Sequence, residues 1–253
     1  SMALPLPVVD GFAVSRGIGS MIHQNVRGLN RDIDTAADED LWEAPTALWV
    51  PPTVVRTHDI KSTSTNDTNS SGTGARTVYI EGLDASYAVQ SETVALNGTS
   101  NVATANDYTM IHFMRVATVG SGGANAGTIT ATAQTDATVT AQIGIGNNQS
   151  LMAIFMVPTS QNAYLTRVWA NIAQSSGGNA EVQLWARDGG ISTEPWRLHT
   201  VLGLVSAGGG GFNYRVDPPI KFTTQHIVKL RASASADNTT VCGGFELIRG
   251  ATI

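Results

Sequence analysis

The stretch Gly127-Thr-Ile-Thr-Ala-Thr132 and the later Thr138-Val-Thr-Ala-Gln-Ile143 alternate polar residues with apolar or small ones. A period of two puts every second side chain on the same face of a strand, so one face can be buried while the other stays in water. Threonine and valine are restricted at χ1 and pack well on a pleated surface, which favours strand over helix. The two stretches therefore predict β-strands.

Two other segments show how the strands are expected to be buried. Thr77-Val-Tyr-Ile-Glu81 places Val78 and Ile80 on one face and its polar residues on the other. The segment 151–157 is apolar throughout and ends before Pro158. Its length is typical of a strand covered on both faces, and we expect it in the centre of a sheet.

The second half of the chain continues the pattern. In 181–187 the alternation leaves Trp185 on the polar face, and 227–232 and 241–249 are expected to be the closing strands. Glycine and asparagine mark the turns, because both tolerate positive φ. About a dozen short strands separated by such turns predict an all-β fold, a β-sandwich with jelly-roll character. No internal repeat is found, which argues against a propeller or a solenoid.

The N-terminal residues 1–50 differ from the rest. They hold seven of the 20 acidic residues and show no clear strand alternation. Thr35-Ala-Ala-Asp38 resembles a capping box and predicts a short helix over about 36–43 that ends before Pro45. We therefore expect an extended N-terminal arm with a short helix over 1–50 and a sandwich over 51–253, with a possible sub-division near 145.

Composition bounds the class of protein. Charged residues make up 14% of the chain and the mean hydropathy is zero, whereas an average chain has about a quarter charged residues. Low charge favours a surface that is hidden in an assembly, although a Thr-, Asn- and Ser-rich surface can also be solvated without charge. The net charge of −5 and the lack of a basic run argue against a nucleic-acid partner. No apolar stretch approaches the length of a membrane span, and no secretory signal is recognised.

No pattern of catalytic or metal-binding residues stands out. The five histidines lack metal-site spacing, and Cys242 has no second cysteine beside it. The acidic residues cluster in 32–40, which is more typical of a solvated face than of a glycosidase pair or a calcium loop. A Ser-His-Asp triad is not excluded by counting, but no Gly-x-Ser-x-Gly motif is present. We expect a protein that is not an enzyme and binds no metal or cofactor.

Aromatic residues are the candidate contact sites. Trp185 and Trp196 on or near a polar face could stack on a sugar ring, but a subunit contact explains them at least as well, because aromatics are enriched at interface centres. Trp42 and Trp49 are expected to be apolar anchors of the arm. The candidates for contact with a partner or a glycan are Trp42, Trp49, Trp185, Trp196 and Tyr214.

Four segments carry a family resemblance. They are 64–84 (STNDTNSSGTGARTVYIEGLD), 91–99 (SETVALNGT), 148–152 (NQSLM) and 235–247, which contains SADNTTV and FEL. Together they resemble virion structural proteins of tailed bacteriophages, marine phages in particular, over roughly residues 60–250. The resemblance implies a structural role and no catalytic residues. Within it, we expect a polar turn before a strand near 76–82 and a paired strand near 92–96.

The resemblance and the low charge predict a structural component of a tailed-phage virion that acts by subunit packing. A capsid decoration or stabilising protein is the first expectation, and a tail or head–tail accessory protein the second. The alternative is a carbohydrate- or receptor-binding module of the particle. The expected partners are copies of the chain in a closed ring, a trimer first, and other virion proteins. A host surface glycan is a partner only in the alternative, and neither nucleic acid nor membrane is expected.

Overall fold

The computed structural model of the chain is all-β, as the sequence predicts. It describes residues 14, 16, 20–44, 46–174, 178–189, 194–206 and 211–251. The strands in these ranges are β1 (Ile22–Ile33), β2 (Glu39–Asp40), β3 (His58–Ser62), β4 (Ala75–Leu83), β5 (Val89–Ala95), β6 (Val102–Ala103), β7 (Met110–Val119), β8 (Ile129–Ala133), β9 (Thr138–Ile143), β10 (Ile154–Met156), β11 (Gln161–Gln174), β12 (Asn179–Arg187), β13 (Arg197–Ser206), β14 (Gly211–Phe222), β15 (Ile227–Ala234) and β16 (Thr239–Ala251).

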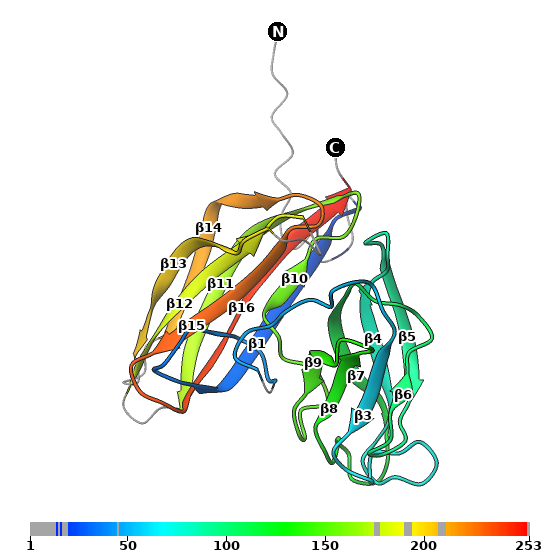
Figure 1. Cartoon of the computed structure of the whole chain (residues 1–253). Helices are drawn as coiled ribbons and strands as arrows, with labels where there is room; N and C mark the ends of the chain where they lie inside the picture. Colours follow the sequence, from blue (N-terminus) through cyan, green and yellow to red (C-terminus); the bar gives the residue numbers. More distant parts are fainter. Residues whose placement is uncertain are drawn as a thin grey trace.

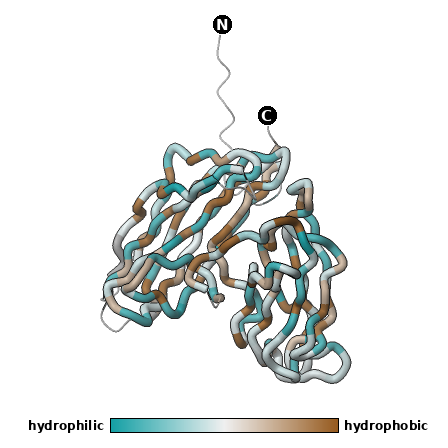
Figure 2. Tube along the Cα trace, in the orientation of Figure 1, coloured by the Kyte–Doolittle hydropathy of each residue, from teal (hydrophilic) through white to brown (hydrophobic). Residues whose placement is uncertain are grey.

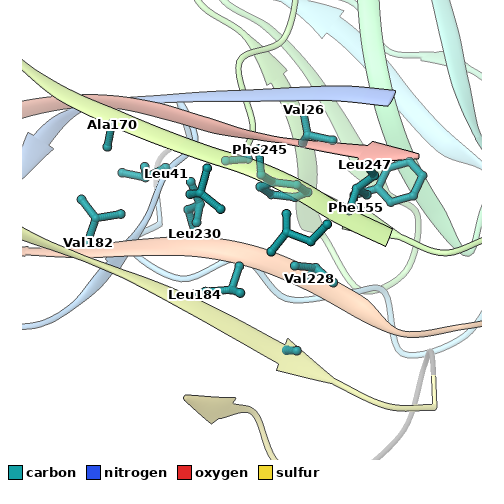
Figure 3. Packing of buried hydrophobic residues seen from close by; sticks show 14 of the residues in the cluster. Val26, Leu41, Phe155, Ala170, Val182, Leu184, Val228, Leu230, Phe245 and Leu247 are labelled. Atoms are coloured by element: carbon teal, nitrogen blue, oxygen red, sulfur yellow. The ribbon is translucent and has the colours of Figure 1, made fainter. Parts of the chain in front are cut away.

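Strands from both ends of the described chain form one group of sheets, which we call the terminal body (β1, β2 and β10–β16). One sheet has the order β1-β16-β11-β14, and the other has the order β10-β15-β12-β13 with β2 beside β15. The two sheets enclose a shared hydrophobic core, in which Phe245 and Leu247 of the first sheet meet Leu184, Val228 and Leu230 of the second (Figure 3). Every second side chain of β12 and β15 points into this core, which confirms the period-two interpretation of these segments.

The strands β3–β9 form a second group, which we call the inserted body because it lies between β2 and β10 in the sequence. Its sheets have the orders β6-β3-β8-β9 and β5-β4-β7. Val78, Ile80 and Ile129 are fully buried in its core. β4 pairs with β5 through Val78 opposite Val94, as the sequence predicts. Figure 1 shows the inserted body beside the β1 and β10 side of the terminal body, and Figure 2 shows hydrophobic segments distributed through both bodies.

β10 is buried on both faces, but it is not in the centre of a sheet. Phe155 packs in the core of the terminal body, whereas Ile154 and Met156 pack in the core that includes the inserted body. β10 pairs only with β15 among the described strands and is therefore at a sheet edge. The expected burial of both faces of this segment is therefore confirmed, because the inserted body covers the second face. The expected position in the centre of a sheet is wrong, because β10 has a paired strand along one edge, β15, among the described strands.

The expectation of an extended arm is wrong for residues 22–33, which form β1 and pair with β16 along most of its length. Val26 and Ile33 are buried, and Gly28 and Asn30 occupy the buried positions between them. Because these two residues are not hydrophobic, the sequence of β1 does not show the alternation of apolar and polar residues that is typical of a strand. A Cβ on Gly28 would lie 2.2 Å from the carbonyl oxygen of Leu41, so only glycine fits there. Residues 1–13 of the predicted arm lie outside the described residues.

The short helix expected over about 36–43 is also wrong. Residues 35–37 form bends, and Glu39–Asp40 forms β2, which pairs with Ala232 and Arg231 of β15. The hydroxyl of Thr35, which would have capped the helix, donates to Asp237 Oδ1 at 2.7 Å. Asn30 Nδ2 donates to the carbonyl oxygen of Asp40 at 3.1 Å. These long-range contacts hold the segment extended.

Candidate functional site

The two N-terminal tryptophans are core residues and not contact residues. Trp42 and Trp49 are both buried in the hydrophobic core that joins the inserted body to β10. Trp42 Nε1 donates to the carbonyl oxygen of Thr46 at 2.9 Å, and Trp49 Nε1 donates to that of Thr140 at 3.0 Å. Burial of the ring with a satisfied N–H is the usual state of a core tryptophan. The expectation that these two side chains contact a partner or a glycan is therefore wrong.

Trp185 and Trp196 lie half-buried on the side of the β12–β15 sheet that faces away from the core of the terminal body. The guanidinium of Arg231 stands 4.5 Å from the ring centre of Trp185. Lys229 Nζ and the Arg187 guanidinium stand 4.0 and 4.9 Å from the ring centre of Trp196. These cations compete with any sugar ring for the aromatic surface, so the arrangement does not favour glycan stacking here.

A buried ion cluster lies beside these rings. Asp40 accepts hydrogen bonds from Lys229 Nζ at 2.5 Å, Arg231 Nε at 3.0 Å and the main-chain N–H of Trp49 at 2.8 Å. Burial lowers the pKa of Lys229 to about 8, although the charge of Asp40 acts in the opposite direction. Trp49 belongs to the core shared with the inserted body, so the ion cluster links the terminal body to that core.

Tyr214 is the exposed member of the five candidates, at 56% exposure. It lies on β14, and Leu198 and Val201 on the neighbouring β13 are 46% and 49% exposed. β13 and β14 are the outer strands of the two sheets of the terminal body. A hollow of about 530 Å³ between them is lined by Tyr214, Val201 and His199, among others. This pair of strands, which we call the outer edge, presents apolar side chains to solvent.

A second hollow lies where the bodies meet, and we call it the junction cleft. It has a volume of about 290 Å³ and is lined by β1, by β4 and β7 of the inserted body, and by the segment 149–152. The ring of His112 stacks on Phe155 at 4.4 Å between ring centres. Burial, and secondarily the charge of Arg249, lowers the pKa of His112 to about 3, so the ring is neutral at ordinary pH.

Asp67 is a further buried charged group, and it is bound entirely by its own chain. Its carboxylate accepts hydrogen bonds from Ser62 Oγ at 2.5 Å and from the main-chain N–H groups of Ala75, Ala126 and Gly127 at 2.7 to 2.9 Å. A carboxylate held by so many donors has little capacity left for a ligand. Asp67 therefore organises loops of the inserted body and is not a reactive group.

Sequence reasoning missed Asp40, Lys229, Asp67 and His112. Asp67 lies inside the stretch 64–84 that carries the family resemblance, and this was the only signal that could have drawn attention to it. Within the described residues, no three His, Cys, Asp or Glu side chains gather closely enough to hold a metal ion. In the same part of the chain, no helix is long and apolar enough to cross a membrane.

Comparisons with known proteins give little further guidance. No protein-family model and no curated protein matches the chain. Among solved structures, it is similar to a chain from "Structure of infectious bursal disease virus Gt strain", with 9% sequence identity and a TM-score of 0.25. The similarity covers 90% of this chain and 72% of the other. Agreement at this level does not establish a shared fold or function.

Proposed function

We propose that the chain is a structural component of a tailed-phage virion and acts by packing against copies of itself and against other particle proteins. A capsid decoration or stabilising protein is the first form of this proposal, and a tail or head–tail accessory protein is the second. The resemblance of residues 64–84 and the other quoted segments supports it, as does the low content of charged residues. Its site of action is then the assembled particle.

The pairing of the terminal body supports a jelly roll. Its strands pair as β1 with β16, β10 with β15, β11 with β14 and β12 with β13, so the first pairs with the last and each later strand with the next one inward. This nesting is what results when one long antiparallel hairpin is rolled into two facing sheets, the arrangement found in jelly rolls of viral capsids and lectins. Because this architecture hosts several functions, it does not select one by itself.

The observation that carries the proposal is the apolar outer edge. Leu198, Val201 and Tyr214 are all about half exposed on two adjacent edge strands. Exposed apolar groups gathered on neighbouring strands are typical of an interaction surface. Pro218 and Pro219 in β14 lack the N–H that would extend a β-ladder, so we expect contact through side chains and not through strand addition. A closed ring, a trimer in the first instance, would bury the outer edge in every copy.

The test is the mass of the assembly in solution. We expect light scattering of the purified chain to give the mass of a trimer, independent of concentration in the micromolar range. Val201→Glu places a charge in the apolar contact and should give a monomer. Ile145→Glu is the matched control, because Ile145 is 66% exposed but lies outside the outer edge. A single-chain mass for the unchanged protein, or a ring that survives Val201→Glu, would refute packing through this edge.

The virion assignment needs a separate measurement. We expect mass spectrometry of purified phage particles to detect the chain at many copies per particle, and a cryo-electron microscopy map of the particle to contain its two bodies. Absence of the chain from particles that retain their other structural proteins would contradict the assignment.

A further inference from the structure

The junction cleft combines side chains that are far apart in the sequence. Gln24 and Arg27 come from β1, Glu81 from β4, and Phe113 from β7, while Gln149 lies in the segment that returns to the terminal body. The cleft thus exists only because the inserted body is held against β1 and β10. The cleft has a volume of about 290 Å³ and both apolar and polar walls. This volume is close to the lower end of the range for small-molecule sites, which begins at about 300 Å³.

The polar lining is mixed in sign and rich in amides. Glu81 and Arg27 contribute one negative and one positive charge to the lining. The guanidinium of Arg249 lies behind Gln24 and Phe155 and is a second nearby cation. Gln24 and Gln149 each carry a donor and an acceptor group. The existing contacts of these groups are long: the Tyr79 hydroxyl donates to Glu81 Oε2 at 3.3 Å, and Arg249 Nε donates to Gln24 Oε1 at 3.3 Å. Such groups can exchange weak internal contacts for contacts with a ligand.

The cleft wall also holds an unsatisfied polar atom. His112 is 8% exposed, and its Nε2 has no hydrogen-bond partner among the described residues. The ring hydrogen-bonds to the main chain of Met156, which leaves Nε2 as an acceptor. A buried acceptor without a donor is unfavourable by about 1 to 3 kcal/mol. The surrounding protein covers this nitrogen completely, so it is a local strain on the cleft wall and not a contact point for a ligand. Phe113, half-buried beside it, offers an apolar wall.

We propose that the junction cleft binds a neutral saccharide of one or two rings. Sugar hydroxyls both donate and accept, which matches a lining of amides, one carboxylate and one guanidinium, and the C–H face of the ring suits the aromatic wall. A site that hydrogen-bonds hydroxyls discriminates strongly against analogues that lack them, because its polar groups are then left unpaired. This proposal goes beyond the structural role and places glycan binding away from Trp185, Trp196 and Tyr214.

The experiment is saturation-transfer NMR on the full chain with the methyl glycosides of glucose, galactose, mannose and N-acetylglucosamine, and with N-acetylneuraminic acid as the charged comparison. We expect at least one of them to receive saturation and its dissociation constant to be unaffected by added salt. Glu81→Gln and Gln149→Ala should each weaken binding about tenfold, equivalent to about 1.4 kcal/mol. Glu181→Gln is the matched control, since Glu181 is a half-buried strand glutamate outside the cleft.

Three outcomes would overturn the proposal: no transfer to any neutral glycoside, transfer only to the charged N-acetylneuraminic acid, or unchanged binding in both cleft variants. Gln149 lies outside the strands, so Gln149→Ala decides the matter if Glu81→Gln proves unstable. The NMR experiment and the light-scattering experiment can fail independently. If the chain binds a sugar as a monomer, the proposed ring is refuted and the proposed saccharide site in the junction cleft stands.

Discussion

Single residues explain why the 64–84 segment has its particular composition. The carboxylate of Asp67 accepts hydrogen bonds from main-chain N–H groups at the start of β4 and in the turn before β8. A Cβ on Gly74 would lie 2.1 Å from Asp67 Oδ1, so glycine is required beside the carboxylate. A segment that reads as a polar turn in the sequence is therefore the point at which three loops of the inserted body are joined.

Asp67→Asn keeps the shape of the side chain but replaces one acceptor oxygen by an NH₂ group that faces N–H donors. We expect it to lower the free energy of unfolding by about 2 to 4 kcal/mol. Urea denaturation followed by circular dichroism measures this. Asp107→Asn is the control, since Asp107 is exposed, and its effect should stay within about 0.5 kcal/mol. Equal stability of the two variants would show that Asp67 is not an organising residue.

At the scale of elements, β1 shows how a strand can lack an obvious pattern. Its buried face carries Val26, Gly28, Asn30 and Ile33, of which only two are hydrophobic. Gly28 is needed because Leu41 and Ala153 approach closely, and Asn30 holds β2 in place through its amide. Two of the four buried positions of β1 therefore hold residues that serve close packing or a buried hydrogen bond. Pattern analysis looks for hydrophobic residues at such positions and so does not detect the strand.

Gly28→Ala tests whether β1 is an integral strand. The new Cβ would meet the main chain of Leu41 and Ala153, so we expect a loss of about 2 to 3 kcal/mol in the free energy of unfolding. Gly250→Ala in β16 is the matched control, because the nearest atom to its Cβ would be at 3.5 Å. It should be neutral or stabilise by a few tenths of a kcal/mol. A neutral Gly28→Ala would indicate that β1 behaves as a detachable arm.

For the whole molecule, the connection between the two bodies combines apolar packing with buried charge. Trp42 and Trp49 contribute the apolar part, and Asp40 with Lys229 and Arg231 contributes the charged part. A buried cluster of this kind contributes little net stability when it is complete, but removal of one member leaves an uncompensated charge. The junction cleft depends on this connection for its shape.

Asp40→Asn is expected to lower the free energy of unfolding by about 3 kcal/mol or more, because two buried cations lose their counter-charge. Adding Lys229→Met removes one of those cations, so the double variant should be less destabilised than the sum of the single variants by at least about 1 kcal/mol. Glu194→Gln, in the exposed pair with Arg197, should cost less than about 0.5 kcal/mol. Additive effects of Asp40→Asn and Lys229→Met in urea denaturation would contradict coupling within the cluster.

Local patterns were sufficient for the all-β class and for the strands β4, β8, β9, β12, β15 and β16, including the inward faces of β4 and β12. Alternation is a property of neighbouring residues, so it survives without knowledge of the fold. It also placed Trp185 correctly on the outer face of β12. It did not show that Arg231 would cover that ring, because Arg231 lies on another strand.

Tertiary contacts decided the rest. Thr35 bonds to Asp237 and so forms no helix cap, the inserted body covers β10 from outside its sheet, and Trp42 and Trp49 become core residues. Gln24, Glu81, His112 and Gln149 line one cleft only because two bodies pack together. Side chains determine which faces of a strand are apolar, but the burial of a residue and its hydrogen-bond partners depend on segments that are remote in the sequence.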